Sequence, residues 1–148
     1  MKKKVLCLYG DGTDIPAMLA GMLQKELGDE YLVESAGVQQ GCAGLHINPL
    51  AFNCLFERGI GAGSYQVRCA LGNETLEEAD CVVYVGLETE NEIIRFFAGD
   101  RLTQLVFVDR CTNGIWIPKD ASIEEYRACA RNIERCIPEV AEEIRSSR

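Results

Sequence analysis

Residues 5–16 read Val5-Leu6-Cys7-Leu8-Tyr9-Gly10-Asp11-Gly12-Thr13-Asp14-Ile15-Pro16, an apolar run followed by a glycine-containing turn and the start of a helix. The run Lys4–Tyr9 predicts a buried strand, because it is short and apolar and ends directly at a glycine. Pro16 is typical of the first turn of a helix, which Thr13 or Asp14 can cap. Apolar residues then recur at helical spacing as far as Gly28. The segment therefore predicts a strand, a turn and a helix.

The rest of the chain repeats this alternation of strands and helices. Further strands are expected at Tyr31–Ser35, Cys81–Val85 and Gln104–Val108. Helical segments are expected at 48–59, 76–80, 88–97 and 123–144. Alternating elements of this kind favour a parallel sheet between helical layers. The sequence therefore predicts one α/β domain over residues 1–148, a three-layer sandwich with a four-stranded parallel sheet.

Length, composition and charge narrow the class of protein. A chain of 148 residues with 47% hydrophobic content can bury a core without disulfides or metals. A net charge of −8 disfavours nucleic acid and anionic membranes as partners, because both carry negative charge. The apolar run after Lys2-Lys3-Lys4 is too short for a secretion signal. We expect an acidic cytoplasmic protein with no cofactor, whose partner is a small ligand or another protein.

The eight cysteines do not have the spacing of a zinc site or a disulfide scaffold. The chain contains no Cys-x-x-Cys pair, and His46 is its only histidine. Five cysteines lie on predicted apolar faces, where a free cysteine behaves as a small hydrophobic residue: Cys7, Cys54, Cys81, Cys129 and Cys136. Of the other three, Cys42 and Cys111 remain candidates for chemistry.

Ligands of open parallel sheets bind beyond the carboxyl ends of the strands. Three segments follow predicted strands at that edge: Tyr9–Pro16, Gly86–Glu88 and Asp109–Gly114. We expect them to surround one crevice, in which the functional site lies.

Several motifs, in order along nearly the whole chain, resemble the low-molecular-weight protein-tyrosine phosphatases and the related thioredoxin-coupled arsenate reductases. They are Val5–Gly10 with the later Pro16, then Glu34-Ser35-Ala36-Gly37, the section from Asn48-Pro49 to Leu71, Ala79-Asp80, and Val108-Asp109. The resemblance implies the fold of that family. It also implies a phosphate-binding loop at residues 9–16 and a general acid at Asp109.

The residues of that loop depart from the family pattern. The family loop is a cysteine, five residues, an arginine, a serine or threonine, and a proline; the cysteine attacks phosphorus and the arginine holds the phosphoryl oxygens. Here the cysteine position is Tyr9, and counting back from Pro16 places the arginine position at Asp14, with a loop one residue short. The chain has no arginine before Arg58, so a shifted alignment does not restore the motif. The sequence thus predicts this fold without this activity, a pseudoenzyme.

The binding residues are expected to be the ones that line the remodelled crevice: Tyr9, Gly10, Asp11, Gly12, Thr13, Asp14 and Asp109. One hypothesis is that Asp11, Asp14 and Asp109 converge as oxygen ligands for a divalent cation. Against it, Asp14 can simply cap a helix and Asp11 can be a turn residue.

The inactive protein is expected to have a binding or regulatory role. Candidate surface aromatic residues for that role are Tyr65, Trp116 and Tyr126, although residues of these types more often cover the edge of a core. The alternative is an active phosphatase or reductase that uses another thiol, either Cys111, which follows an arginine, or Cys42 in a glycine-rich loop.

Overall fold

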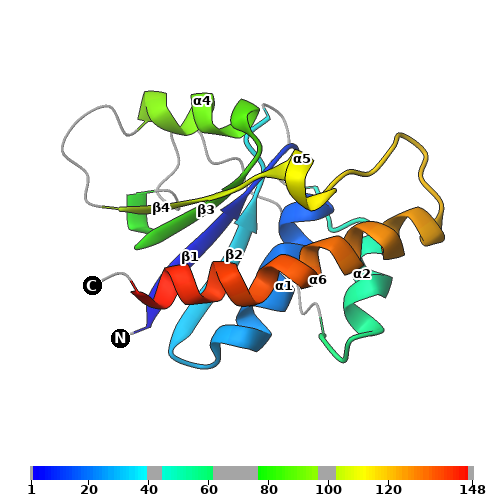
Figure 1. Ribbon diagram of the computed structural model, residues 1–148, viewed down its shortest axis with the longest axis horizontal. Helices are drawn as coiled ribbons and strands as arrows, with labels where there is room; N and C mark the ends of the chain where they lie inside the picture. Colours follow the sequence, from blue (N-terminus) through cyan, green and yellow to red (C-terminus); the bar gives the residue numbers. More distant parts are fainter. Residues whose placement is uncertain (1, 40–44, 62–76, 97–102, 147–148) are drawn as a thin grey trace.

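A computed structural model of the chain describes residues 2–39, 45–61, 77–96 and 103–146 (Figure 1). Strands and helices alternate along these residues. The strands are β1 (Lys3–Leu8), β2 (Tyr31–Ala36), β3 (Cys81–Val85) and β4 (Gln104–Val108). The helices are α1 (Ile15–Leu27), α2 (Pro49–Phe56), α4 (Leu87–Phe96), α5 (Arg110–Asn113) and α6 (Ile123–Ser146).

The four strands form one parallel sheet in the order β2-β1-β3-β4. Strand β1 lies in its centre, with Val5 opposite Val33 of β2 on one side and Cys81 of β3 on the other. Because every strand runs in the same direction, the segments that follow β1, β3 and β4 leave the sheet at the same edge. This arrangement confirms the predicted α/β class and the parallel sheet.

Alternate residues of β1 enter two different cores. Val5 and Cys7 pack with α1 and α6 in the larger core, whereas Leu6 and Leu8 pack with Ile93 of α4 in the smaller one. Figure 1 shows α4 on one side of the sheet and α1, α2 and α6 on the other. Since both faces of β1 and β3 are covered, these strands are apolar without alternation.

Most predicted boundaries agree with the structure to within one or two residues. Strand β1 ends at Leu8, so Tyr9 belongs to the turn rather than to the strand. Helix α6 continues through Pro138 as far as Ser146. Helix α5 was not predicted. Its signals are present in the sequence, because Asp109 is a good N-cap residue and Gly114 adopts a left-handed conformation directly after the last helical residue.

Candidate functional site

The turn after β1 is closed by hydrogen bonds among its own residues. Gly10 and Gly12 have positive φ angles of 51° and 84°, which favour glycine. The Gly12 amide donates to the Tyr9 carbonyl at 3.1 Å. The Asp11 carboxylate accepts from the amide and the hydroxyl of Thr13, at 2.9 and 2.7 Å. Asp11 therefore has the turn role that was set against the cation hypothesis.

Neighbouring segments hold the same turn from outside. The amides of Val38 and Gln39, just after β2, donate to the Gly10 carbonyl at 2.7 and 3.1 Å. The Asn48 amide, just before α2, donates to the Thr13 carbonyl at 2.8 Å. Gly37 lies so close that a Cβ atom there would stand 2.4 Å from the Asp11 carbonyl carbon. The Ser-Ala-Gly motif thus supplies the glycine that lets the end of β2 approach the turn.

Asp14 occupies the position expected for the family arginine, and it caps α1. Its carboxylate accepts from the Ile15 amide at 2.6 Å, and the Tyr126 hydroxyl of α6 lies 3.5 Å from its other oxygen. Burial raises the pKa of Asp14, and the nearby Asp11 adds to that effect. Burial and the Asp14 carboxylate together raise the pKa of Tyr126 to about 12. Residue 14 therefore offers a partly buried carboxyl group where a phosphate site would need a cation.

Asp109 follows β4 and is engaged as the N-cap of α5. One of its oxygens accepts from the Cys111 and Thr112 amides at 3.0 and 3.4 Å, and the other accepts from the Thr112 hydroxyl at 2.6 Å. The hydrogen bonds from Thr112 are the main cause that lowers the pKa of Asp109. A general acid must hold a proton near neutral pH, and these bonds favour the ionised form instead.

Glu88 and Arg110 join the other two strand-end segments. The Arg110 Nε atom lies 3.3 Å from a Glu88 carboxylate oxygen, within ion-pair distance but without the geometry of a hydrogen bond. The Glu88 carboxylate also packs over Gly86, where a Cβ atom would approach it to 2.6 Å. Arg110 is thus paired with Glu88 rather than with its neighbour Asp109.

Tyr9 lies among all three segments, as the sequence predicted. Burial raises the pKa of its phenol, the charge of Arg110 opposes that rise, and Glu88 and Asp14 add to it. The predicted crevice residues at the ends of β1, β3 and β4 are therefore electrostatic neighbours. The sequence left open whether Arg110 pairs with Asp109 or with another carboxylate of the crevice, and the structure shows that the partner is Glu88. The contact of Asp14 with Tyr126 was not predicted, because it joins elements far apart in the chain.

The cysteines divide by burial. The five predicted to lie in the core, Cys7, Cys54, Cys81, Cys129 and Cys136, are all buried and free, and burial raises the pKa of each. Cys111 is exposed on α5. Cys42 and Tyr65 lie outside the described residues. Of the other aromatic candidates, Trp116 is 62% exposed, whereas Tyr126 is buried and belongs to the core, which is the more common place for such a residue.

The cation hypothesis gains no support from the geometry. In the parts of the chain that the structure describes, no three His, Cys, Asp or Glu side chains are placed to hold a metal ion. Asp11, Asp14 and Asp109 are all described, and each is engaged by its own local hydrogen bonds.

No helix in the described part of the chain has the length and apolar character to cross a bilayer.

Comparisons with known proteins agree with this fold. The low molecular weight phosphotyrosine protein phosphatase model matches residues 16–148, so the chain belongs to that family. The match begins at Pro16, directly after the turn that follows β1. No curated protein sequence gives a significant match to the chain.

Solved structures that resemble the chain share its fold at low sequence identity. A protein tyrosine phosphatase has a TM-score of 0.78 and 17% identity, over 100% of this chain and 99% of its own. The YwlE arginine phosphatase from Geobacillus stearothermophilus has a TM-score of 0.77 and 23% identity, over 97% and 94%. An arsenate reductase in its phosphate-binding state has a TM-score of 0.71 and 18% identity, over 96% and 98%. The architecture is therefore that of phosphatases and of a reductase alike.

Proposed function

We propose that this family member is a catalytically inactive cytoplasmic protein with a binding or regulatory role. The observation that carries the proposal is the turn after β1, which has a phenol at Tyr9 and a carboxyl group at Asp14 where the reaction needs a thiol and a guanidinium. A tyrosine hydroxyl with a raised pKa is a poor nucleophile near neutral pH. The first step of phosphoryl transfer thus lacks its attacking group.

Electrostatics at the turn also oppose binding of the substrate. A phosphate ester dianion needs a bidentate cation, and the charged side chains of residues 9–14 are instead the carboxylates of Asp11 and Asp14. A like-charge contact at about 4 Å costs roughly 4 kcal/mol per pair of unit charges at an effective dielectric constant near 20. The nearby cation Arg110 is paired with Glu88. The turn is therefore unsuited to an oxyanion.

Asp109 supports the same proposal from the leaving-group side. Its carboxylate caps α5 through three hydrogen bonds, and its pKa is lowered. Protonating a leaving phenolate from this position would first require the proton that these bonds disfavour. An aspartate is thus present at the position of the family general acid, but its side chain caps the N-terminus of α5.

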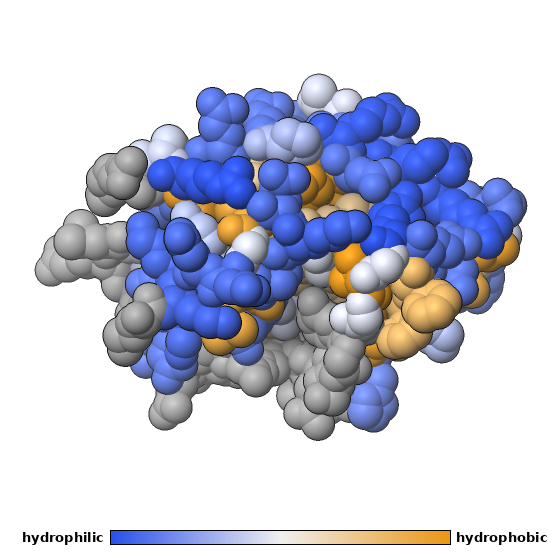
Figure 2. All heavy atoms as spheres, turned by 90° about the horizontal axis from the view of Figure 1, so that it is seen from below, coloured by the Kyte–Doolittle hydropathy of each residue, from blue (hydrophilic) through white to orange (hydrophobic). Residues whose placement is uncertain are grey.

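A binding role draws support from exposed apolar side chains. Trp116, between α5 and α6, and Phe56, at the end of α2, are 62% and 69% exposed. Figure 2 shows a surface that is mostly hydrophilic from this side, with a larger hydrophobic area on the right over α2. Phe52, on the same helix, is also exposed. Exposed aromatic residues of this kind are common where proteins contact partners.

The test is turnover of p-nitrophenyl phosphate by the purified full-length protein. We expect no hydrolysis above the buffer rate and no rise of Tm with phosphate or vanadate. Tyr9→Cys is expected to remain inactive, because it restores the thiol but leaves Asp14 at the arginine position. Hydrolysis by the unmodified protein would contradict the proposal.

The alternative is a thiol enzyme that uses a different cysteine. The exposure of Cys111 next to the crevice residue Asp109 favours this candidate over any of the buried cysteines. Its distinguishing result is hydrolysis, or arsenate reduction with thioredoxin, that the unmodified protein performs and that Cys111→Ser abolishes. The same assay with Cys42→Ser separates the two thiols that the sequence left open.

A further inference from the structure

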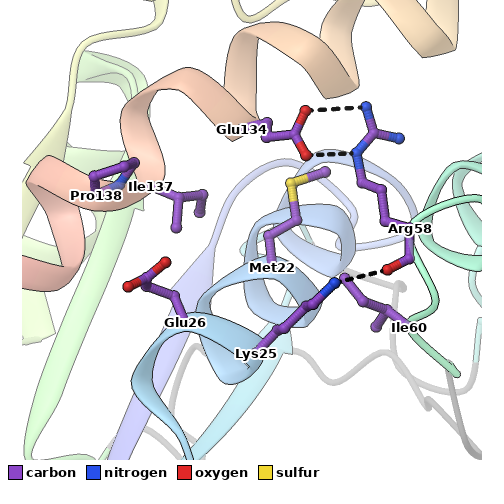
Figure 3. A pocket seen from close by; sticks show the side chains of 8 residues that line it. All are labelled: Met22, Lys25, Glu26, Arg58, Ile60, Glu134, Ile137 and Pro138. Carbon is purple, nitrogen blue, oxygen red and sulfur yellow. Dashed lines mark hydrogen bonds and ion pairs between the residues drawn. The ribbon is translucent and has the colours of Figure 1, made fainter.

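A cavity of about 430 Å³ opens between α1, the segment after α2, and α6 (Figure 3). The cavity lies beside the C-terminal end of α1, where Met22, Lys25 and Glu26 line it. The loop after β1 instead leads into the N-terminal end of that helix. From Asp14 to Lys25 is eleven residues, or about 16 Å along the helix axis at 1.5 Å per residue. The cavity is therefore separate from the candidate site at the carboxyl ends of the strands. Its volume is within the range of about 300–1,000 Å³ usual for small-molecule sites.

One wall of the cavity is a network of hydrogen bonds. The Arg58 guanidinium donates to both oxygens of Glu134 at 3.2 and 3.5 Å, and to the Cys54 carbonyl at 2.9 Å. The Lys25 ammonium donates to the Arg58 carbonyl at 2.9 Å. These bonds hold the segment after α2 against both long helices. The polar wall is thus preformed, which reduces the entropy cost of binding a ligand.

The floor of the cavity is apolar. Met22 and Ile137 are each 5% exposed and line it from α1 and α6, and Ile60 closes the side next to α2. Figure 3 shows Met22 in the centre, between Ile137 and the Arg58 side chain. A methionine side chain adapts to different shapes, because it is unbranched and polarizable. The floor therefore suits the apolar part of a ligand.

The charges around the cavity differ in whether they are already paired. Arg58 and Glu134 pair with each other, and Glu26 lies 3.8 Å from Arg145 of α6. Among the described residues, Lys25 forms no ion pair and donates only to a carbonyl group. An ammonium group has three donors, so Lys25 retains hydrogen-bonding capacity at the rim. The lining holds two cations and two carboxylates, and among the described residues Lys25 is the one of the four without an ion-pair partner.

We propose that this cavity binds a small molecule with an apolar body and one carboxylate, the body lying on Met22 and Ile137 and the carboxylate meeting Lys25. The apolar floor of the cavity matches the apolar body of such a ligand, and the unpaired Lys25 matches its carboxylate. The hydrogen-bonded polar wall keeps the cavity in shape. The proposal does not depend on whether the protein is a phosphatase. It concerns a different end of α1 and a different ligand chemistry.

Octanoate is a suitable probe, and methyl-labelled methionine reports on the cavity directly. Of the three methionines in the chain, Met22 lines the cavity and Met18 is fully buried one turn earlier in α1. Titration of the full-length protein is expected to move the Met22 methyl signal saturably and the Met18 signal much less. Octan-1-ol and octylammonium are expected to bind more weakly than octanoate.

The variant Lys25→Gln tests the charge assignment. It is expected to weaken octanoate binding roughly fivefold, near the upper limit for an exposed ion pair, and to leave octan-1-ol binding unchanged. Lys119→Gln is the matched control, because Lys119 is exposed on the connection between α5 and α6, outside the cavity lining.

Three results would overturn the proposal. The first is the absence of a saturable Met22 shift up to about 10 mM octanoate, where even a site with a Kd of 1 mM would be mostly filled. The second is equal or tighter binding of octylammonium or octan-1-ol. The third is an equal loss of octanoate affinity in Lys25→Gln and Lys119→Gln. None of these measurements uses phosphatase activity. The proposal of a ligand in this cavity and the proposal of catalytic inactivity can therefore be refuted independently of each other.

Discussion

Replacing Gly37 by alanine tests whether the end of β2 packs against the turn after β1 as the structure shows. The added Cβ atom would stand 2.4 Å from the carbonyl carbon of Asp11, 2.5 Å from its oxygen and 2.8 Å from its Cα atom. Carbon atoms in ordinary contact are about 3.5–4.0 Å apart, so the overlap is about 1 Å. The obstructing atoms belong to the backbone, which cannot rotate away as a side chain could.

The expected cost follows from the size of that overlap. Overpacking in a closely packed region typically costs about 1–3 kcal/mol. Relief requires the turn to move, and such a movement also strains the bonds from Val38 and Gln39 to the Gly10 carbonyl. With about 2 kcal/mol, the middle of that range, Gly37→Ala is expected to lower Tm by roughly 4–8 °C for a chain of this length.

Thermal unfolding followed by circular dichroism measures this change, with Gly61→Ala as the matched control. Gly61 is exposed, has no positive φ and has no atom within 4 Å of the position of an added Cβ. Its replacement is expected to change stability by no more than about 0.5 kcal/mol. If Gly37→Ala melts within about 1 °C of Gly61→Ala, the close packing of β2 on the turn is refuted.

Two further predictions concern ionisable groups. Burial raises the Asp14 pKa, so the native state holds this proton to higher pH than the unfolded chain, and the free energy of unfolding falls as pH rises from about 4 through the raised pKa. The variant Asp14→Asn keeps a good N-cap residue and is expected to raise the urea midpoint at pH 7. This gain is expected to vanish below about pH 4. The control Asp29→Asn, on the exposed loop after α1, is expected to leave the urea midpoint unchanged. Iodoacetamide is expected to label Cys111 in the native protein, while Cys7, Cys54, Cys81, Cys129 and Cys136 react only after denaturation, as peptide mass spectrometry can check. Labelling of buried Cys129 as fast as Cys111 would contradict the described core.

The alternation of elements was predictable because it depends on local patterns. The apolar runs at Cys81–Val85 and Gln104–Val108 are strands with the predicted bounds. The helix after β1 begins one residue earlier than Pro16 and ends at Leu27, before the predicted stop at Gly28. Turn residues, caps and periodicity are short-range signals, and here they agree with one another.

The side-chain partners at the site were less predictable. Arg110 was expected to pair with Asp109 or another carboxylate of the crevice, and its partner is Glu88 at the start of α4. Asp109 instead caps α5, a helix too short to produce a periodic signal. Local sequence identifies which groups carry charge, but the partner of each depends on which loops meet at the edge of the sheet.

The sequence by itself predicted the family fold, and it showed that residues 9–16 depart from the family loop pattern, since they contain no cysteine and no arginine. Only the tertiary structure decided that Asp14 meets Tyr126, 112 residues later in the chain, and that α1 and α6 leave a cavity lined by Met22 and Lys25. The physical reason is the distance along the chain over which each kind of interaction acts. Hydrophobic period and turn chemistry act between near neighbours along the chain, whereas pairings and cavities arise from how finished helices pack around the sheet.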